Sequence, residues 1–226
     1  MNIEAFQSEI GINFKDKSLL EKAVTHTSYA YEHGVESYEK LEYLGDAILE
    51  FIISEYLFKN YSHLSEGEMT KVRAGVVCEE SLYEVATRHN FGSYLNLGKS
   101  EIATGGNKNQ AILADCVEAV IAATFLDQGI ETAKDFIIKN LNGTVENCTK
   151  NVGKKDYKTL LQEKLQVHGN IHIEYKTIKE EGPDHDKKFT VELFVNGRAE
   201  TVGEGPTKKA AEMMAAKKAL DKNGRS

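Results

Sequence analysis

The sequence predicts an all-helical N-terminal domain followed by a small domain whose elements run α-β-β-β-α. Up to about Leu141, apolar residues recur mainly at steps of three and four, as they do on the packed faces of helices. Later runs alternate apolar and polar residues, which is typical of strands. Charge divides the chain as well: residues 1–150 hold 13 Lys/Arg and 23 Asp/Glu (net −10), whereas residues 151–226 hold 15 and 12 (net +3). This asymmetry indicates two modules with different roles.

Composition is that of a soluble protein with a real core. The 226 residues are 41% hydrophobic and 28% charged, with only two prolines. The longest apolar run, Ile112–Leu126, contains two acids and is shorter than the roughly 20 apolar residues of a membrane span. Residues 1–14 show no secretory-signal pattern, and the three cysteines form no CxxC pair, which favours reduced thiols. We therefore expect a cytoplasmic protein that does not associate with membranes.

Helical periodicity predicts the main helices of the first domain. They cover Leu19–Thr25, Leu41–Leu57, Ser81–His89 and Ile112–Phe125. The polar stretch Asn142–Asp156 contains two glycines and interrupts the pattern, as a linker does. We place the first domain at residues 1–148, the linker at 149–154 and the second domain at 155–226.

The second domain has its own sequence of signals. Asp156–Gly169 is a short amphipathic helix, and the Asn196–Gly197 pair is a strong hairpin signal. Thr207 is suited to cap the N-terminus of a final helix. The three predicted strands are Ile171–Ile178, Phe189–Val195 and a strand around Glu200–Gly203.

Three acids share one face of the helix that begins near Glu39. Glu39, Glu42 and Asp46 are spaced i, i+3 and i+7, so that they lie along one stripe. Taken alone, this stripe is better explained as the solvated face of a packed helix.

A second helix makes a metal site the better explanation. Asp115 and Glu118 are surrounded by apolar or small residues, and such a helix is normally buried. A buried carboxylate is costly unless it is paired or binds a metal, and neither acid has Lys or Arg at i+4. The helix dipole could account for Asp115 if the helix began near Ala114, but it does not account for Glu118.

Carboxylates on two helices suit a hard cation such as Mg²⁺. A zinc site would need His or Cys ligands at characteristic spacing, and the histidines of the first domain show none. We interpret them as core or surface residues: His26, His33, His63 and His89.

Several ordered motifs resemble the ribonuclease III family. The motif "YEKLEYLGDAILE" (Tyr38–Glu50) resembles the family signature, and "ILADCVEAVIAA" (Ile112–Ala123) resembles its second acidic motif. "AVTHTSYAYE" and "LSEGEMTKVRAGVV" also occur in the family's order. The C-terminal "DYKTLLQE", "EGPDH" and "GPTKKAAEMMAA" resemble a double-stranded-RNA-binding domain.

This resemblance implies a Mg²⁺-dependent endoribonuclease that cuts double-stranded RNA. The products would be staggered, with 5′-phosphate and 3′-hydroxyl ends, and the enzyme would act in rRNA and mRNA processing and decay. Mn²⁺ is expected to replace Mg²⁺, and no nucleotide cofactor is expected. By position, Asp46 and Glu118 match the most critical catalytic acids. The implied metal ligands are Glu42, Asp46, Asp115 and Glu118.

The resemblance also implies subsidiary residues and a homodimer. Glu39 and Glu66 match acids with a lesser part, and Tyr43 matches an aromatic residue at the dimer interface. The implied RNA contacts are Thr159, Gln162, Glu163, Pro183, His185, Lys208 and Lys209. Many relatives outside bacteria have a third lysine where this chain has Glu212, which predicts a weaker grip on phosphate.

Three alternatives are weighed against these assignments. Lys208 and Lys209 could be ordinary surface lysines, although lysines at a helix N-terminus also suit an anion site. The chain could be an RNA-binding protein that has kept the fold and lost catalysis, but such a protein would be expected to have lost some of the acids. An enzyme acting on small phosphates would leave the C-terminal domain unexplained.

Overall fold

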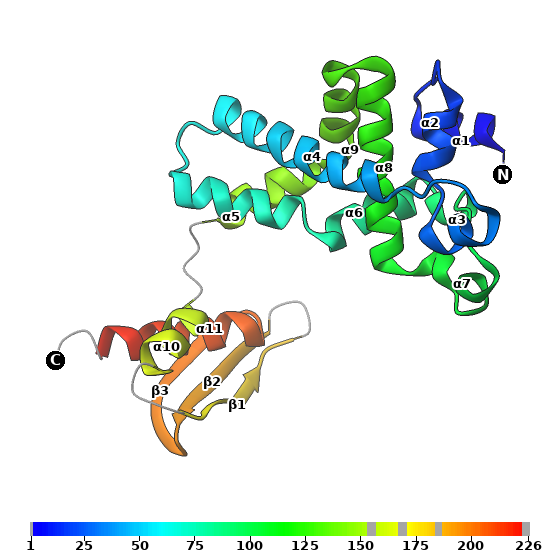
Figure 1. The fold of residues 1–226 in the computed structure, drawn as a ribbon. Coiled ribbons are helices and arrows are strands. Elements are labelled where there is room, and N and C mark those ends of the chain that lie inside the picture. The colour runs from blue at the N-terminus through cyan, green and yellow to red at the C-terminus, as the bar shows by residue number, and fades with distance from the viewer. Residues whose placement is uncertain (1, 153–156, 167–170, 184–186, 223–226) are drawn as a thin grey trace. The chain divides into compact units, whose positions relative to one another are not determined.

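The chain forms two compact units, residues 1–152 (the N-terminal unit) and 153–226 (the C-terminal unit) (Figure 1). The structure is a computed structural model, and it describes residues 2–152, 157–166, 171–183 and 187–222. His185 and Gly169 therefore lie outside the described residues. Each unit is considered by itself below.

The N-terminal unit is built from helices, as the hydrophobic spacing predicts. Its α-helices are α1 (Ile3–Ile10), α2 (Lys17–Ala23), α3 (Thr27–His33), α4 (Glu39–Asn60), α5 (Glu66–Val76), α6 (Glu79–Arg88), α7 (Lys99–Ala103), α8 (Gln110–Gln128) and α9 (Ile130–Asn151). Two 3₁₀ turns are η1 (Phe91–Ser93) and η2 (Gly106–Lys108). The four helices predicted from periodicity are confirmed as α2, α4, α6 and α8.

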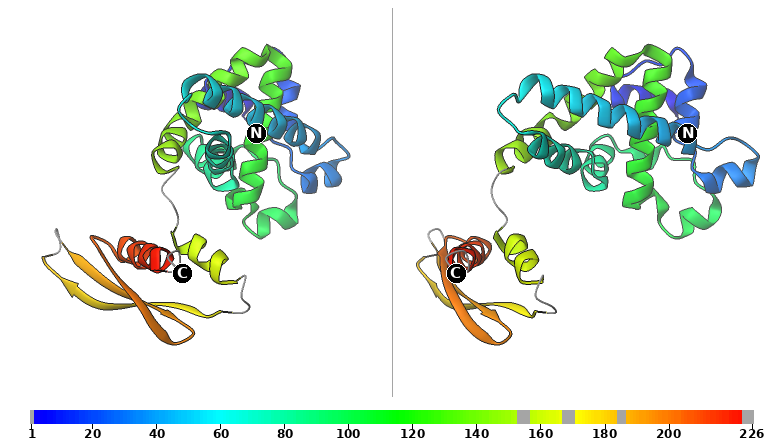
Figure 2. Two further views of the ribbon diagram at one scale, coloured as in Figure 1. Left: turned by 90° about the vertical axis from the view of Figure 1, so that its left-hand side faces the viewer. Right: turned by 60° about the vertical axis from the view of Figure 1, so that its left-hand side comes forward.

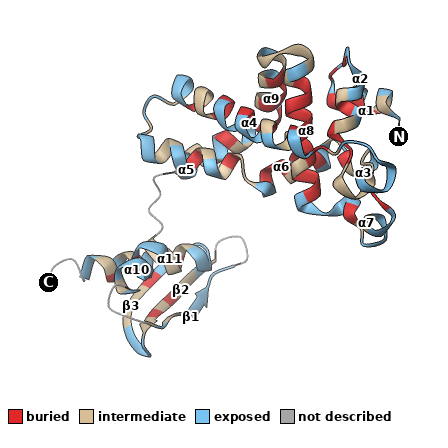
Figure 3. Cartoon of the chain, in the orientation of Figure 1, coloured by how far each residue is buried: buried red, intermediate tan, exposed pale blue. Residues whose placement is uncertain are grey.

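Helix α8 lies at the centre of this unit, and α4 crosses it (Figure 1). Figure 3 shows α8 buried along most of its length. From Ile112 to Ala123 its alanines, valines and isoleucines are buried, because α2, α4, α6 and α9 pack around it. The two acids of α8, Asp115 and Glu118, are half-buried at the border of this apolar core, where an unpaired carboxylate is unfavourable.

Helix α9 corrects the prediction of a linker after Leu141. The helix continues to Asn151, so residues 149–151 of the predicted linker are helical. The reason is that Leu141 and Val145 are buried one turn apart and extend the packed face begun by Phe136 and Ile137. The residues between them are less buried, and their polar composition resembles that of a loop.

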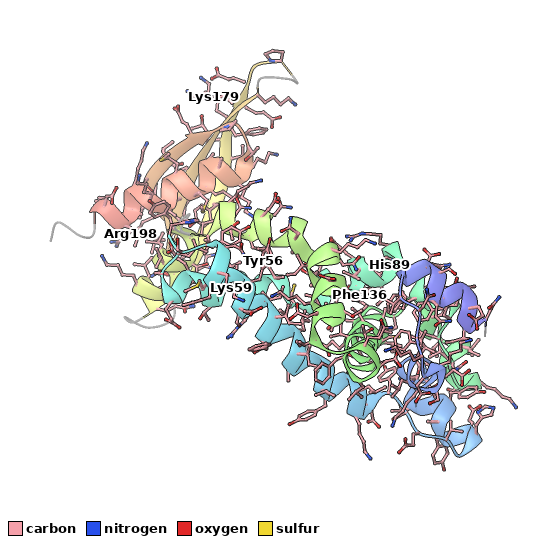
Figure 4. All side chains as sticks on the ribbon, turned by 90° about the horizontal axis from the view of Figure 1, so that it is seen from above. Tyr56, Lys59, His89, Phe136, Lys179 and Arg198 are labelled. Atoms are coloured by element: carbon pink, nitrogen blue, oxygen red, sulfur yellow. The ribbon has the colours of Figure 1, made fainter. Side chains whose placement is uncertain are left out.

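The partly buried side chain of His89 connects three helices of this unit. The Nδ1 atom of His89 lies 2.9 Å from the carbonyl oxygen of Glu9, and its Nε2 lies 2.7 Å from Oδ1 of Asn140. The ring of His89 also lies near that of Phe136, with 6.1 Å between centroids (Figure 4). His89 therefore joins the end of α6 to α1 and α9, which is the structural role predicted for it.

The C-terminal unit follows the predicted order of helix, three strands and helix. Its elements are α10 (Tyr157–Gln166), β1 (Ile173–Glu181), β2 (Lys188–Val195), β3 (Arg198–Gly205) and α11 (Lys208–Lys222). The sheet is antiparallel in the order β1-β2-β3, and both helices lie on one of its faces (Figure 2).

Local sequence explains the turn and the cap of this unit. Asn196 and Gly197 have φ values of +50° and +77°, as the tight hairpin between β2 and β3 requires, and glycine adopts such values without strain. The Thr207 hydroxyl accepts a hydrogen bond from the Ala210 N–H at 3.1 Å, which confirms it as the N-cap of α11. The core lies between Leu161 of α10, Leu193 of β2 and the alanines of α11. Among the residues described, no helix has the length and apolar character needed to cross a membrane.

Candidate functional site

A glycine allows α4 and α8 to cross at backbone contact. A Cβ atom built on Gly45 would lie 1.9 Å from the backbone oxygen of Glu118, so any larger residue would push the helices apart. On α4, Glu42 lies one turn before Gly45, and Asp46 directly follows Gly45. On α8, Asp115 lies one turn before Glu118. The close crossing therefore brings the acids of both helices to one place.

Three of the four predicted metal ligands meet at this crossing. One carboxylate oxygen each from Glu42, Asp115 and Glu118 lies within 4.8 Å of the others. All three side chains are half-buried. We call this group the acidic centre. Helix α8 begins at Gln110, so Asp115 lies beyond the first turn and the helix-dipole explanation for it does not apply.

The fourth predicted ligand, Asp46, lies at the edge of the acidic centre. It is exposed and is not one of the three residues whose oxygens come together. Its charge nevertheless acts on both Glu118 and Glu42, which places it close to them. Glu39 is exposed, accepts a hydrogen bond from the Ser37 hydroxyl at 2.9 Å and acts on Glu42 through its charge.

Glu66 is not in the acidic centre of its own chain. It begins α5, accepts a hydrogen bond from the Thr70 hydroxyl at 3.2 Å, and lines a surface cavity with Phe58 and Met69. Phe58 is sixteen residues after Glu42 on α4, a separation of about 24 Å along a helix. Within one chain, Glu66 is therefore remote from the acidic centre.

Burial and like charges make the acidic centre electrostatically unfavourable without a cation. Burial, followed by the charges of Asp46, Asp115 and Glu42, raises the pKa of Glu118 to about 8. Burial is also the main cause that raises the pKa of Glu42 and that of Asp115. A divalent cation would replace this repulsion with attraction, and hard oxygen donors are the ligands that Mg²⁺ prefers.

The raised pKa of Glu118 predicts how stability depends on pH without metal. Between about pH 4.5 and 8 the folded chain keeps a proton that the unfolded chain releases, so the free energy of unfolding falls as pH rises. We expect the melting temperature in EDTA to fall by a few degrees over this range. Glu118→Gln should flatten the profile, and a slope equal to that of the wild type would contradict the prediction.

Replacing Gly45 with alanine should disrupt the crossing. The added methyl group would meet the Glu118 backbone, and overpacking of this kind costs about 1–3 kcal/mol. We expect a lower melting temperature together with weaker divalent-cation binding, because the two pairs of acids move apart. Gly143→Ala is the matched control, since nothing lies within 4 Å of the Cβ atom that it would add on α9. Equal behaviour of the two variants would show that the close approach is unimportant.

Two aromatic neighbours of the acidic centre, Tyr38 and His26, carry no signal in the sequence that links them to it. Tyr38 is only 2% exposed, and burial together with the charge of the nearby Asp115 raises the pKa of its hydroxyl. The His26 ring lies edge-on to the Tyr38 ring at 5.7 Å between centroids. Both residues belong to quoted motifs, but no ligand spacing connects them to the acids. Only the fold places them together.

The predicted RNA contacts lie on exposed parts of the C-terminal unit. Thr159, Gln162 and Glu163 are exposed on α10, while Leu161 between them is buried in the core. Pro183 is exposed after β1. Lys208 and Lys209 are exposed in the first turn of α11, directly after the Thr207 cap. These residues are therefore accessible to a ligand.

Glu212 faces a lysine of the neighbouring helix. Its carboxylate lies 2.7 Å from the Nζ atom of Lys158 on α10, and the same Nζ lies 4.6 Å from the centre of the Tyr175 ring. The carboxylate thus has a counter-charge within the unit. Because this charge is compensated, Glu212 should weaken binding of RNA phosphates less than an unpaired carboxylate would. A lysine at this position would still add a cation for phosphate binding.

Comparisons with known proteins agree with the geometry. Residues 16–144 match the family described as Ribonuclease-III-like, and residues 157–223 match the double-stranded RNA binding motif. The chain is 48% identical over 219 residues to Ribonuclease 3 of Clostridium acetobutylicum, covering 96% of this chain and 95% of that protein. It is 44% identical over 225 residues to Ribonuclease 3 of Clostridium perfringens, covering 99% and 95%.

A solved structure gives the same result for the helical unit. The nuclease domain of ribonuclease III from Campylobacter jejuni is 37% identical, with a TM-score of 0.58, and the match covers 62% of this chain and 99% of that one. The two domain types occur here in the order that the sequence predicts. The chain therefore belongs to the ribonuclease III family of double-strand-specific endoribonucleases.

Proposed function

We propose that this endoribonuclease is a Mg²⁺-dependent, homodimeric enzyme that hydrolyses phosphodiesters of duplex RNA to staggered products. The products carry 5′-phosphate and 3′-hydroxyl ends, and the enzyme acts in the cytoplasm in rRNA and mRNA processing and decay. Mn²⁺ replaces Mg²⁺, and no nucleotide cofactor takes part. The observation that carries the proposal is the acidic centre, where three carboxylates meet.

The donor set of the acidic centre fits a divalent cation. Glu42, Asp115 and Glu118 would hold it through oxygen atoms, with Asp46 at the exposed edge. When bound, such a cation neutralises charge on the phosphate and lowers the pKa of a water molecule so that it can attack. The charge of the cation also lowers the pKa of Glu118, so that this carboxylate is ionised under working conditions.

The residues of the chain contribute the electrostatic environment of the site and its accessibility to RNA. The apolar surroundings of Asp115 and Glu118 keep the electrostatic interactions in the centre strong. Asp46 is exposed, so it is accessible from the side on which a long RNA must approach. We expect substitutions of Asp46 and Glu118 to lower the cleavage rate more than substitutions of the other acids.

Duplex binding is assigned mainly to the C-terminal unit. Such modules recognise the shape of A-form RNA across roughly 16 base pairs, touching two minor grooves and the phosphates between them. Thr159, Gln162 and Glu163 would meet one minor groove, and Pro183 and His185 the next. Lys208 and Lys209 would bind the phosphates.

An exposed aromatic stripe on α4 supports the homodimer. Tyr43, Phe51 and Phe58 are 82%, 59% and 74% exposed, and their spacing of eight and seven residues puts them on one face. Large exposed apolar patches mark interaction sites, and a two-fold interface pairs the same patch on both chains. We therefore place the dimer interface along this face.

The surface cavity between α4 and α5 gives Glu66 a place in the dimer. It has a volume of about 270 Å³, and Leu57, Phe58, Met69 and Glu66 contribute to its lining. In a two-fold interface, Tyr43 of one chain could enter the cavity of the other. Because Tyr43 adjoins Glu42, this arrangement would bring Glu66 of one chain to the acidic centre of its partner.

Tyr43→Asp should convert the dimer to a monomer. The new carboxylate would be buried without a partner in the interface, which costs several kcal/mol. Sedimentation at micromolar concentration measures the outcome. Tyr31→Asp is the matched control, since Tyr31 is 92% exposed on α3, away from the stripe. A wild-type protein that sediments as a monomer at this concentration would contradict the proposed homodimer.

The chemistry is tested with one end-labelled RNA duplex. We expect cleavage with Mg²⁺, none after EDTA, and staggered products whose 5′ ends lose phosphate to a phosphatase. The RNA ends that disappear in cells lacking the protein would identify its natural substrates. Cleavage that persists in EDTA, or products with 3′-phosphates, would contradict the proposal.

A further inference from the structure

An apolar groove lies along the outer side of α11 in the C-terminal unit, beside the start of α10. It has a volume of about 490 Å³. We call it the methionine groove and define it by its lining residues: Tyr157, Thr207, Lys209, Ala210, Met213, Met214 and Lys217. The last four recur at helical spacing along one face of α11, and the opposite face is buried against the core of the unit.

The methionine groove gathers apolar side chains that the core of the unit does not use. Met214 is 42% exposed, and Tyr157 and Met213 are only partly buried. Methionine is flexible and polarizable, so that it adapts to different apolar partners at binding surfaces. Apolar side chains that gather in one groove, rather than being scattered over the surface, mark an interaction site.

Two lysines at the methionine groove have no acidic partner. Within the described parts of this unit, neither Lys209 nor Lys217 takes part in an ion pair. The Nζ atom of Lys217 instead lies over the ring of Tyr157, 5.5 Å from its centroid. Other lysines of the unit do pair with glutamates: Lys158, Lys176, Lys179, Lys187, Lys188, Lys208 and Lys222. The groove therefore offers an apolar floor together with positive charge that no acid of the unit neutralises.

Duplex RNA does not match the whole of the methionine groove. Tyr157 lies on one side of α10, and the residues assigned to a minor groove lie roughly 140–240° further around this helix: Thr159, Gln162 and Glu163. A phosphate would pair with the lysines but would leave the methionines without an apolar partner. One face of the Tyr157 ring is occupied by Lys217, so that face is not open for stacking of a base. The occupant must supply both apolar surface and negative charge.

We propose that the methionine groove binds an acidic amphipathic helix of a partner protein. Apolar side chains of that helix would pack on Met213 and Met214, as in other complexes in which a helix lies in a groove. Its carboxylates would pair with Lys209 and Lys217, which are eight residues apart, or about 12 Å along α11. This distance corresponds to slightly more than two turns, so acids on successive turns of the partner can reach both lysines.

Methionine methyl groups report binding directly in the full chain. Two of its four methionines line the methionine groove, and Met69 lies in the other unit. The probe is a lactam-stapled helical peptide with leucines at i, i+3 and i+7 and glutamates beside them. We expect the ¹³C-methyl resonances of Met213 and Met214 to shift, and that of Met69 to stay in place. The dissociation constant should be of the order of 100 µM, because the contact is small.

Two altered peptides separate the contribution of charge from that of apolar contact. A peptide with lysines in place of the glutamates should cause no shift, because Lys209 and Lys217 repel it. A peptide with serines in place of the leucines should also fail. The shifts caused by the acidic peptide should weaken as salt is added. Equal shifts with the lysine peptide, or no shift with millimolar acidic peptide, would overturn the proposal.

Substitutions in the methionine groove test the same contacts from the side of the protein. Met214→Gln and Lys217→Glu should each raise the dissociation constant of the acidic peptide about tenfold. Ile178→Gln and Lys176→Glu are the matched controls on β1, which contributes nothing to the groove. Equal losses in the groove variants and in their controls would contradict the assignment. The comparison of peptides needs no substitution, so it decides the question even for a variant that does not fold.

Two other occupants would give different signals. A single-stranded RNA oligonucleotide that shifts the Met214 methyl resonance and displaces the acidic peptide would assign the methionine groove to RNA. Shifts of the same resonance that depend on protein concentration, without peptide, would assign it to a second copy of the chain. Either result would overturn the proposal. Shifts that depend on the acidic peptide alone are the expected result.

Discussion

Glu118→Gln abolishes cleavage of duplex RNA and leaves its binding nearly intact: this is the largest effect we expect from one substitution. The amide keeps the shape of the side chain but not the charge that holds a cation in the acidic centre. Loss of several kcal/mol of transition-state stabilisation lowers the rate by about 10³-fold or more. Single-turnover cleavage in Mg²⁺ measures this loss.

The binding half of this prediction is measured in Ca²⁺. Its looser coordination should misplace the attacking water, so that RNA binds without being cut. Glu50→Gln on α4 is the matched control, because Glu50 is exposed and outside the acidic centre. A Glu118→Gln protein that cuts at the wild-type rate would refute the assignment, and a collapse of RNA affinity would indicate damage to the fold.

Most of the fold was predictable because local patterns agree with packing. The apolar spacing of α8, the Asn196–Gly197 turn and the Thr207 cap each depend on neighbours in the sequence. The end of α9 was not predictable in the same way. Its outward face is polar enough to resemble a linker, and only the burial of Val145 against other helices shows that the helix continues.

The candidate site was predictable as a set of residues but not as a geometry. An acid such as Glu118 in an apolar helix is conspicuous, because burial must be compensated. The sequence did not indicate that Gly45 sets the helix separation, nor that the buried Tyr38 lies near the acids of α8, since both depend on how α4 crosses α8. It also could not show that Glu66 lies far from Glu42 in its own chain.

Separating the two units should separate cutting from tight binding. A fragment of residues 1–153 keeps α9 whole, because the helix ends at Asn151 and the division between the compact units follows Val152. We propose that it folds and retains the acidic centre, and that it cuts duplex RNA with an affinity reduced about 100-fold. Lower salt should partly restore cleavage, because the remaining attraction to phosphate is electrostatic.

The complementary fragment, residues 154–226, should bind duplex RNA and never cut it, because it contains none of the acids of the acidic centre. In the full chain, replacing both Lys208 and Lys209 with alanine should weaken RNA binding and lower the salt dependence of that binding, while the cleavage rate at saturating RNA stays unchanged.

Both fragments and this variant would be compared on one duplex at two salt concentrations. Because A-form shape and 2′-hydroxyls are what such a unit recognises, duplex DNA of the same sequence should bind far more weakly. Cleavage by the C-terminal fragment, or equal affinity for RNA and DNA, would overturn this division of labour.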